Sequence, residues 1–86
     1  MKIVFKYELT VQNEKIDIPF GAKFLHFGEQ NQRLYAWFQF DEDQTVLEQF
    51  YYLIAITGYT KIPDHYKFYQ TCQTKDGTVW HLFSEF

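Results

Sequence analysis

Short runs in which apolar and polar residues alternate are the feature that most constrains the fold of this chain. In residues 3–11 every odd position is apolar, and Lys6, Glu8 and Thr10 lie between them. A period of two is typical of a strand with one buried face, because successive side chains point to opposite sides. No stretch shows a helical period over a convincing length, so we expect a mainly β chain with at most one short helix.

The first two runs are predicted to pair as a hairpin. Residues 3–11 and 15–18 are separated by a turn at 12–14. Pro19, which has no amide hydrogen to donate, marks the end or edge of the second strand.

A second hairpin is expected from residues 22–27 and 34–40, which flank a loop containing glycine and asparagine. In the return strand, alternation places Tyr35, Trp37 and Gln39 on one face. That face is aromatic rather than charged, so both faces of this strand are expected to be covered.

The middle of the chain predicts a central strand followed by a long loop. Residues 46–49 are compatible with one helical turn, whereas 50–56 are β-branched and aromatic and predict a strand that ends at Gly58. Residues 59–65 include a proline and show little periodicity. Long irregular loops carry function more often than short ones.

The clearest hairpin is predicted at the end, from 66–74 and 78–83 across a turn at Asp76-Gly77, residues suited to positive φ. The runs amount to about seven strands, joined mainly by hairpins. We therefore expect one domain, 1–86, folded as an antiparallel barrel or sandwich.

Aromatic residues make up 22% of the chain, more than one small core requires. Each ring brings about 150–250 Å² of surface to bury, and a chain of this size hides only about 60–65% of its unfolded surface. The excess points to binding, through either a pocket or a subunit interface. Small domains often need a partner subunit for stability, and we expect a homo-oligomer.

The charge balance and the single cysteine limit the partners and the compartment. The chain has eight Lys and Arg, fewer than its eleven Asp and Glu, and it has no basic run, so we do not expect direct nucleic-acid binding. Cys72 has no intramolecular partner, which favours a reducing compartment and a cytosolic protein. No apolar run is long enough for a membrane helix.

No residue pattern predicts catalysis, a metal or a cofactor. His26, His65 and His81 lie in separate segments without the spacing of a metal site. Cys72 has no neighbouring base, and the acidic stretch 41–43 reads as a solvated turn. We expect a non-enzymatic protein with no cofactor.

Ligand binding has more support, because cationic, hydrogen-bonding and ring-bearing side chains lie in or beside the aromatic strands. Rings stack on purines, and arginine pairs with phosphate. The alternative, that these are core rings and solvated charges, stays open. The candidate binding residues are Lys23, His26, Arg33, Tyr35, Trp37, Tyr59 and His81.

A set of short motifs resembles a family of small proteins encoded mostly by bacteriophages and prophages. The motifs are Lys6-Tyr7, Leu9, Pro19, Gly21-Ala22-Lys23, Leu25-His26, Gln30-Asn31, Trp37, Thr57-Gly58, Val79-Trp80-His81 and Phe83. The resemblance covers nearly the whole chain and adds Thr57 to the candidate set. Members usually carry Thr-Gly-His where this chain has Thr57-Gly58-Tyr59, so a role for that histidine does not transfer.

The resemblance implies a phage context rather than an activity, with action in the host cytoplasm. The first hypothesis is a counter-defence protein that sequesters a nucleotide-derived immune signal of the host. The second is a protein-interaction module that inhibits a host defence enzyme or nuclease complex through an aromatic surface. A third is a structural or assembly accessory whose extra rings lie in oligomer contacts.

Overall fold

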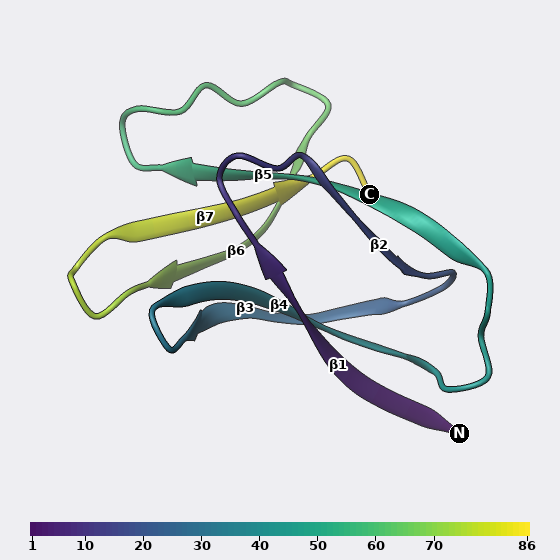
Figure 1. The fold of residues 1–86 in the computed structure, drawn as a ribbon. Coiled ribbons are helices and arrows are strands. Elements are labelled where there is room, and N and C mark those ends of the chain that lie inside the picture. Colours follow the sequence, from purple (N-terminus) through teal and green to yellow (C-terminus); the bar gives the residue numbers. More distant parts are fainter.

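The computed structural model describes residues 1–86, which form seven strands and no helix (Figure 1). The chain therefore has no helix of the length and apolarity needed to cross a membrane. The expected seven-stranded, mainly β chain is confirmed. The strands are β1 (Lys2–Leu9), β2 (Lys15–Pro19), β3 (Lys23–Gln30), β4 (Arg33–Asp41), β5 (Leu47–Ile56), β6 (Lys67–Gln73) and β7 (Val79–Ser84).

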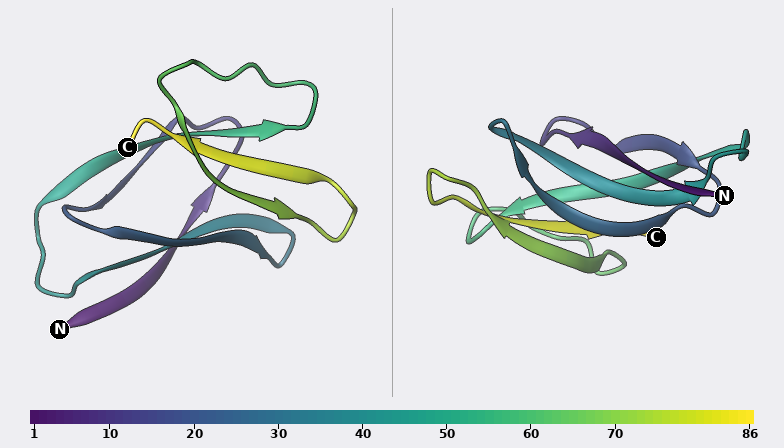
Figure 2. Two further views of the ribbon diagram at one scale, coloured as in Figure 1. Left: turned by 180° about the vertical axis from the view of Figure 1, so that it is seen from behind. Right: turned by 90° about the horizontal axis from the view of Figure 1, so that it is seen from below.

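The strands form two antiparallel sheets rather than a closed barrel. One sheet has the order β1-β4-β3 and the other β2-β5-β7-β6. Figure 2 shows the flat body that results, and its extents are 41 × 30 × 18 Å. Since β1 and β2 each keep one edge without a partner strand, the sheets do not close. Of the two expected architectures, the sandwich is the one that forms.

The predicted hairpin between the first two strands is wrong. β1 pairs with β4 and β2 pairs with β5, so the connection between them crosses from one sheet to the other. The Tyr52 hydroxyl holds this crossing, because it accepts from the Thr10 amide at 3.1 Å and donates to the Thr10 carbonyl at 3.2 Å. Alternation identifies which face of a strand is buried, but it carries no information about the partner strand.

The other two hairpins are confirmed, with different turn details. The β3–β4 turn is only Asn31-Gln32, whose φ angles are 53° and 66°. In the β6–β7 turn Gly77 alone has positive φ, at 90°. Asp76 accepts hydrogen bonds instead, from the Thr74 hydroxyl and the Thr78 amide.

The central strand expected in the middle of the chain is β5, and it is extended over its whole length. β5 starts at Leu47, so the helical turn considered for 46–49 does not form. β5 lies between β2 and β7, the central position expected for it. The irregular segment after it spans 57–66 and contains the predicted loop.

Aromatic rings from both sheets form the core. Phe38 of β4 meets Phe50 of β5 edge to face, with ring centroids 5.2 Å apart. A bulge in β6 between Phe68 and Gln70 accompanies two further edge-to-face contacts, in which Tyr69 packs against Phe24 at 5.0 Å and Phe50 at 5.7 Å. Edge-to-face pairs add about 0.5–1.5 kcal/mol each beyond the area they bury. Much of the aromatic excess therefore lies inside the sandwich.

Gln70 joins the two sheets where β3 and β6 meet. The Phe27 amide donates to Gln70 Oε1 at 2.8 Å, and Gln70 Nε2 donates to the Phe27 carbonyl at 2.7 Å. One side-chain amide thus pairs with β3 as a neighbouring strand would. This satisfies the backbone of a residue that is fully buried.

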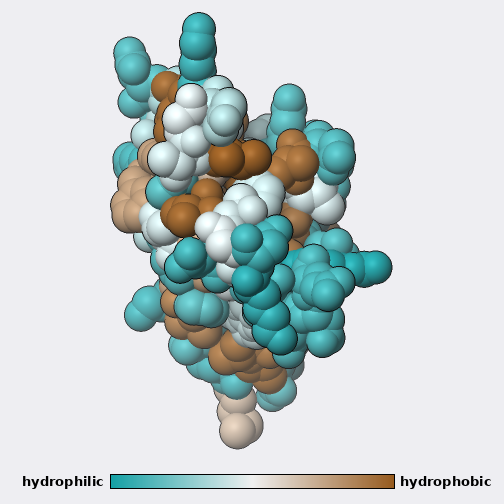
Figure 3. Space-filling view, turned by 90° about the vertical axis from the view of Figure 1, so that its left-hand side faces the viewer, coloured by the Kyte–Doolittle hydropathy of each residue, from teal (hydrophilic) through white to brown (hydrophobic).

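The first half of β1 extends beyond the core. Ile3, Val4 and Phe5 are 40%, 55% and 56% exposed, whereas Leu9 at the other end of the strand is buried. In Figure 3 hydrophobic side chains gather at the lower end of the molecule, where Figure 1 places the N-terminus. The alternation in β1 is as expected, but only its second half has a core to face.

Candidate ligand-binding surface

The outer face of the β1-β4-β3 sheet brings five of the predicted binding residues together. Residues that lie directly opposite each other on paired strands share a face. Trp37 of β4 has Lys6 on one side and His26 on the other, and Tyr35 lies between Glu8 and Gly28. The predicted residues on this face are Lys23, His26, Arg33, Tyr35 and Trp37.

Three rings adjoin one another on this face, from His26 across to Trp37 and then along β4 to Tyr35, and we call them the row of rings. The centroid of His26 is 5.5 Å from that of Trp37, and the centroid of Tyr35 is 5.9 Å from that of Trp37. His26 is exposed, and the other two rings are half-buried. Strands β3 and β4 hold all of them, and the planes of neighbouring rings are tilted by 49° and 58°, so the rings form an uneven aromatic surface that is partly open to solvent.

Gly28 makes room for the His26 ring. A Cβ built on Gly28 would lie 2.7 Å from His26 Nε2, which shows that the imidazole lies across the glycine. The sequence analysis placed Gly28 in the loop of the second hairpin, and this is wrong, because Gly28 lies inside β3. A glycine within a strand often marks such a close approach.

The orientation of the His26 ring is set by Gln70 at the edge of β3. Gln70 Nε2 lies 3.3 Å from His26 Nδ1, and the contacts of Gln70 with Phe27 fix which end of its amide is the nitrogen. Gln70 therefore donates and Nδ1 accepts, so Nε2 carries the ring proton. That N–H is a donor on the outer face.

Cations border the rings. The Lys6 ammonium lies 4.6 Å from the centroid of the Tyr35 ring and donates to Gln30 Oε1. Arg33 Nη1 lies 3.4 Å from Glu8 Oε1, an exposed ion pair at one end of the row. Such pairs contribute little to stability, because both charges stay in water. The Arg33 guanidinium can therefore exchange the Glu8 carboxylate for an anionic ligand.

This face is positive on a chain whose net charge is −3. It carries Lys2, Lys6, Lys23 and Arg33 against only Glu8 and Asp41. The rest of the chain holds four cations and nine carboxylates. Charge is thus divided between the two layers of the sandwich, and an anion would be attracted to the outer face of the three-stranded sheet.

The other predicted residues lie elsewhere. His81 of β7 is held by two hydroxyls, with Thr57 Oγ1 2.7 Å from Nε2 and Thr71 Oγ1 2.8 Å from Nδ1. Tyr59 is 86% exposed in the loop after β5. Thr57, Tyr59 and His81 belong to the four-stranded sheet and its loop, so the structure does not join them to the row of rings.

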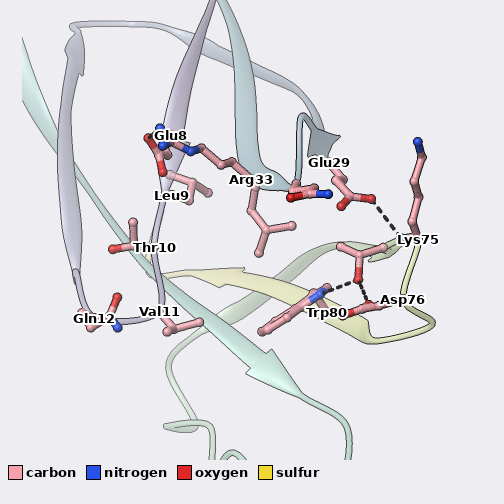
Figure 4. Close-up of a pocket in the computed structure, with 13 residues that line it drawn as sticks. Glu8, Leu9, Thr10, Val11, Gln12, Glu29, Arg33, Lys75, Asp76 and Trp80 are labelled. Carbon is pink, nitrogen blue, oxygen red and sulfur yellow. Dashed lines mark hydrogen bonds and ion pairs between the residues drawn. The ribbon is translucent and has the colours of Figure 1, made fainter.

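A separate cavity of about 540 Å³ opens where the end of β1 and the β3–β4 and β6–β7 turns converge (Figure 4). Trp80 forms part of its wall, and its indole N–H donates to Thr74 Oγ1 at 3.2 Å. The Lys75 side chain points away from the cavity, while the Lys75 amide donates to Glu29 at 2.9 Å. Arg33 is the only predicted residue in its lining.

The cavity is chemically unlike the outer face. Glu8, Glu29 and Asp76 contribute carboxylates, and Arg33 already contacts one of them. The Thr74 hydroxyl and the Thr78 amide hold the pKa of Asp76 below its usual value. An anionic ligand would meet more repulsion here than above the rings.

Sequence reasoning missed three residues that build the surface, namely Lys6, Gly28 and Gln70. Lys6 was read as the polar side of a strand and as part of a family motif, but not as a binding residue, and Gly28 was read as part of a loop. No local signal identifies Gln70, because its partners are more than forty positions away. No group of three or more His, Cys, Asp or Glu side chains is placed to hold a metal ion.

Comparison with known proteins gives a family. Residues 1–86 match the model of a domain of unknown function, DUF7352. The chain belongs to the DUF7352 family. No curated protein and no solved structure matches it. The outer face of this DUF7352 domain must therefore be interpreted from its own chemistry.

Proposed function

We propose that this protein binds a nucleotide-like ligand, an anion with an aromatic base, on the outer face of the β1-β4-β3 sheet and holds it without converting it. The observation that carries the proposal is the row of His26, Trp37 and Tyr35 bordered by cations on an otherwise acidic chain. Rings accept a base by stacking, and Lys or Arg pairs with phosphate.

The arrangement suggests how such a ligand would lie. The base would stack on Trp37, the ring at the centre of the row. The Nε2–H of His26 would donate to a base or phosphate oxygen. Lys23 and Lys6, which lie on either side of β4, would meet the phosphates.

Sequestration is the proposed role of this binding. The resemblance of the chain to phage-encoded proteins supports a counter-defence function, in which the protein removes a nucleotide-derived immune signal in the host cytoplasm. A protein that acts by sequestration needs affinity and abundance but no catalytic group.

Titration calorimetry with a panel of nucleotides tests the proposal. The panel holds mononucleotides, cyclic mono- and dinucleotides, and a short single-stranded oligonucleotide. We expect a small nucleotide to bind and to raise the melting temperature, since a ligand that binds only the folded state stabilises it. Trp37→Ala should weaken binding about ten-fold or more, because base stacking contributes about 1–3 kcal/mol.

Tyr59→Ala is the matched control, since it removes an exposed ring from the loop after β5. It should leave the affinity unchanged. The proposal fails if no nucleotide in the panel binds, or if Trp37→Ala and Tyr59→Ala have equal effects. Preferential binding of the oligonucleotide would replace the small ligand with single-stranded nucleic acid.

A second candidate is a module that inhibits a host defence enzyme or nuclease complex. The observation in its favour is exposed apolar surface outside the row of rings, at Val4, Phe5 and Phe68, which are 55–58% exposed. Capture of one host enzyme by the native protein, lost in Phe68→Ser and retained in Trp37→Ala, would favour this function over nucleotide binding.

A further inference from the structure

The outer edge of β1 is a strand edge that the fold leaves open. Natural sheets usually protect their edges, because unpaired amides and carbonyls attract another strand. Three of the four sheet edges here are protected. β3 and β6 meet through Gln70, and β2 is short and ends in Pro19.

β1 has none of these protections. It is eight residues long, contains no proline, and pairs with β4 without a register shift. Ile3, Val4 and Phe5 in its first half are 40–56% exposed. A long and regular edge strand with an exposed apolar stretch is a site for strand addition.

The backbone groups of β1 that face outward can be identified. The Met1 carbonyl accepts from the Glu42 amide at 2.9 Å, so this odd-numbered residue is hydrogen-bonded to the β4 side. Backbone groups alternate in direction along a strand. The amides and carbonyls of the even-numbered residues, Lys2, Val4, Lys6 and Glu8, therefore point to the open edge.

We propose that a second copy of this chain occupies that edge, with β1 pairing antiparallel to β1 of the partner around Phe5. In this register the numbers of two facing residues always add up to twice the number of Phe5. Lys2 lies opposite Glu8 of the partner subunit, and Phe5 lies opposite Phe5 of the partner subunit. About eight backbone hydrogen bonds would form from the four even-numbered residues on each side.

Charge selects this register over its neighbours. A shift by one residue on each strand in one direction places Lys2 opposite Lys6 of the partner subunit. A shift in the other direction places Lys6 opposite Lys6 of the partner subunit. Like charges directly opposite each other are destabilising, so of these three registers only the Phe5-centred one sets unlike charges in line.

Side-chain contacts support the same register. Phe5 is a non-hydrogen-bonded position of the new pair, in which side chains lie closest. Its ring already contacts Tyr7, with centroids 5.4 Å apart. Pairing would therefore extend an aromatic cluster across the dimer axis and cover apolar surface that is exposed in one copy.

The dimer would contain a continuous sheet with β1 and its symmetry mate at the centre. Because the two-fold axis is perpendicular to that sheet, both rows of rings would lie on the same side. This inference does not depend on the proposed nucleotide binding, since the association state is measured without a ligand.

Sedimentation velocity from low to high micromolar concentration tests association. The native chain should form a dimer. Val4→Pro should weaken association about ten-fold or more, because it removes an outward amide while leaving the ladder with β4 intact. Val4→Thr, which keeps a β-branched residue and the amide, is the control. A native chain that stays monomeric, or a dimer that persists in Val4→Pro, overturns the proposal.

Two further variants test the register. Lys2→Glu should dissociate the dimer and the double variant Lys2→Glu/Glu8→Lys should restore it, while Lys61→Glu in the loop should have no effect. In a Cys72→Ser background, Phe5→Cys should form a disulfide-linked dimer on oxidation, because Cα atoms of such a pair lie within disulfide range. Equal cross-linking of Val4→Cys, which lies off the axis, would contradict the register.

Discussion

At the scale of single residues, residues that would not touch a ligand determine how the binding side chains are placed. Gly28 contributes no side chain, yet it determines where the His26 ring lies. Gln70 contacts the same ring from the edge of β3 and fixes which nitrogen carries the proton. The binding surface thus depends on residues that would not themselves touch a ligand.

Gly28→Ala should displace the His26 ring with little loss of stability, because the clash is with the far end of a side chain. We expect a change in the His26 ring signals in NMR and weaker nucleotide binding, with the free energy of unfolding within about 1 kcal/mol of native. Gly21→Ala is the contrast. Gly21 has a φ of 80° with open space around it, so alanine should cost about 1 kcal/mol and leave His26 unchanged.

Cys72 should react slowly with thiol reagents. Burial, together with the charge of Glu29, raises the pKa of its thiol, and the thiolate is the reactive form. At mildly alkaline pH the native protein should be alkylated more slowly than the same chain in denaturant. Glu29→Gln should speed the native reaction, and equal rates in native and unfolded chains would contradict this account.

At the scale of elements, the β6–β7 hairpin depends on Asp76 in its turn. The Thr74 hydroxyl and the Thr78 amide favour the charged form and lower the pKa of Asp76 from 3.8. A lowered pKa in the folded state means that the charged group stabilises the fold above 3.8, and that this contribution is lost as pH falls through the lowered value.

Comparison of native and Asp76→Asn proteins tests this dependence. By urea denaturation the native protein should be the more stable at neutral pH, and the difference should shrink as pH falls below 3.8. A difference that stays constant down to acid pH would show that the turn does not depend on the carboxylate charge.

An interaction could be predicted from the sequence when its partners lie close together in the chain, and could not when they lie far apart. The β3–β4 and β6–β7 hairpins were predictable, because turn residues and partner strands are neighbours in the chain. The pairing of β1 with β4 was not, since alternation in residues 3–11 marks a face and not a partner. For the same reason Arg33, Tyr35 and Trp37 were named as candidates without their relation to Lys6, which only the β1–β4 register reveals.

At the scale of the whole molecule, two sheets share one aromatic core and meet along the β3 and β6 edges. Phe38 and Phe50 link the layers from within. Gln70 links the edges, and its amide is the only side chain that pairs with both backbone groups of Phe27. Loss of this side chain should therefore lower the stability of both sheets together.

Gln70→Leu should lower the free energy of unfolding by about 2–4 kcal/mol, because a buried amide and a buried carbonyl each lose a partner. Gln73→Leu is the matched control, an exposed glutamine on the same strand with a single 3.4 Å contact. It should change stability by less than about 0.5 kcal/mol. Equal midpoints in urea for the two variants would mean that Gln70 does not join the sheets.

The strand order also determines how the chain folds while it is being synthesised. β1, β3 and β4 all leave the ribosome by Asp41, so the first sheet has its partners early. β2 is made between them but has no partner strand until β5 is made, and the backbone of Phe27 has no hydrogen-bond partner until Gln70 is made. Until β5, β6 and β7 follow, the apolar inner side of the first sheet lacks most of the side chains that cover it. We therefore expect the growing chain to expose this apolar side from the completion of β4 until the later strands are made, and to be prone to aggregation during that time.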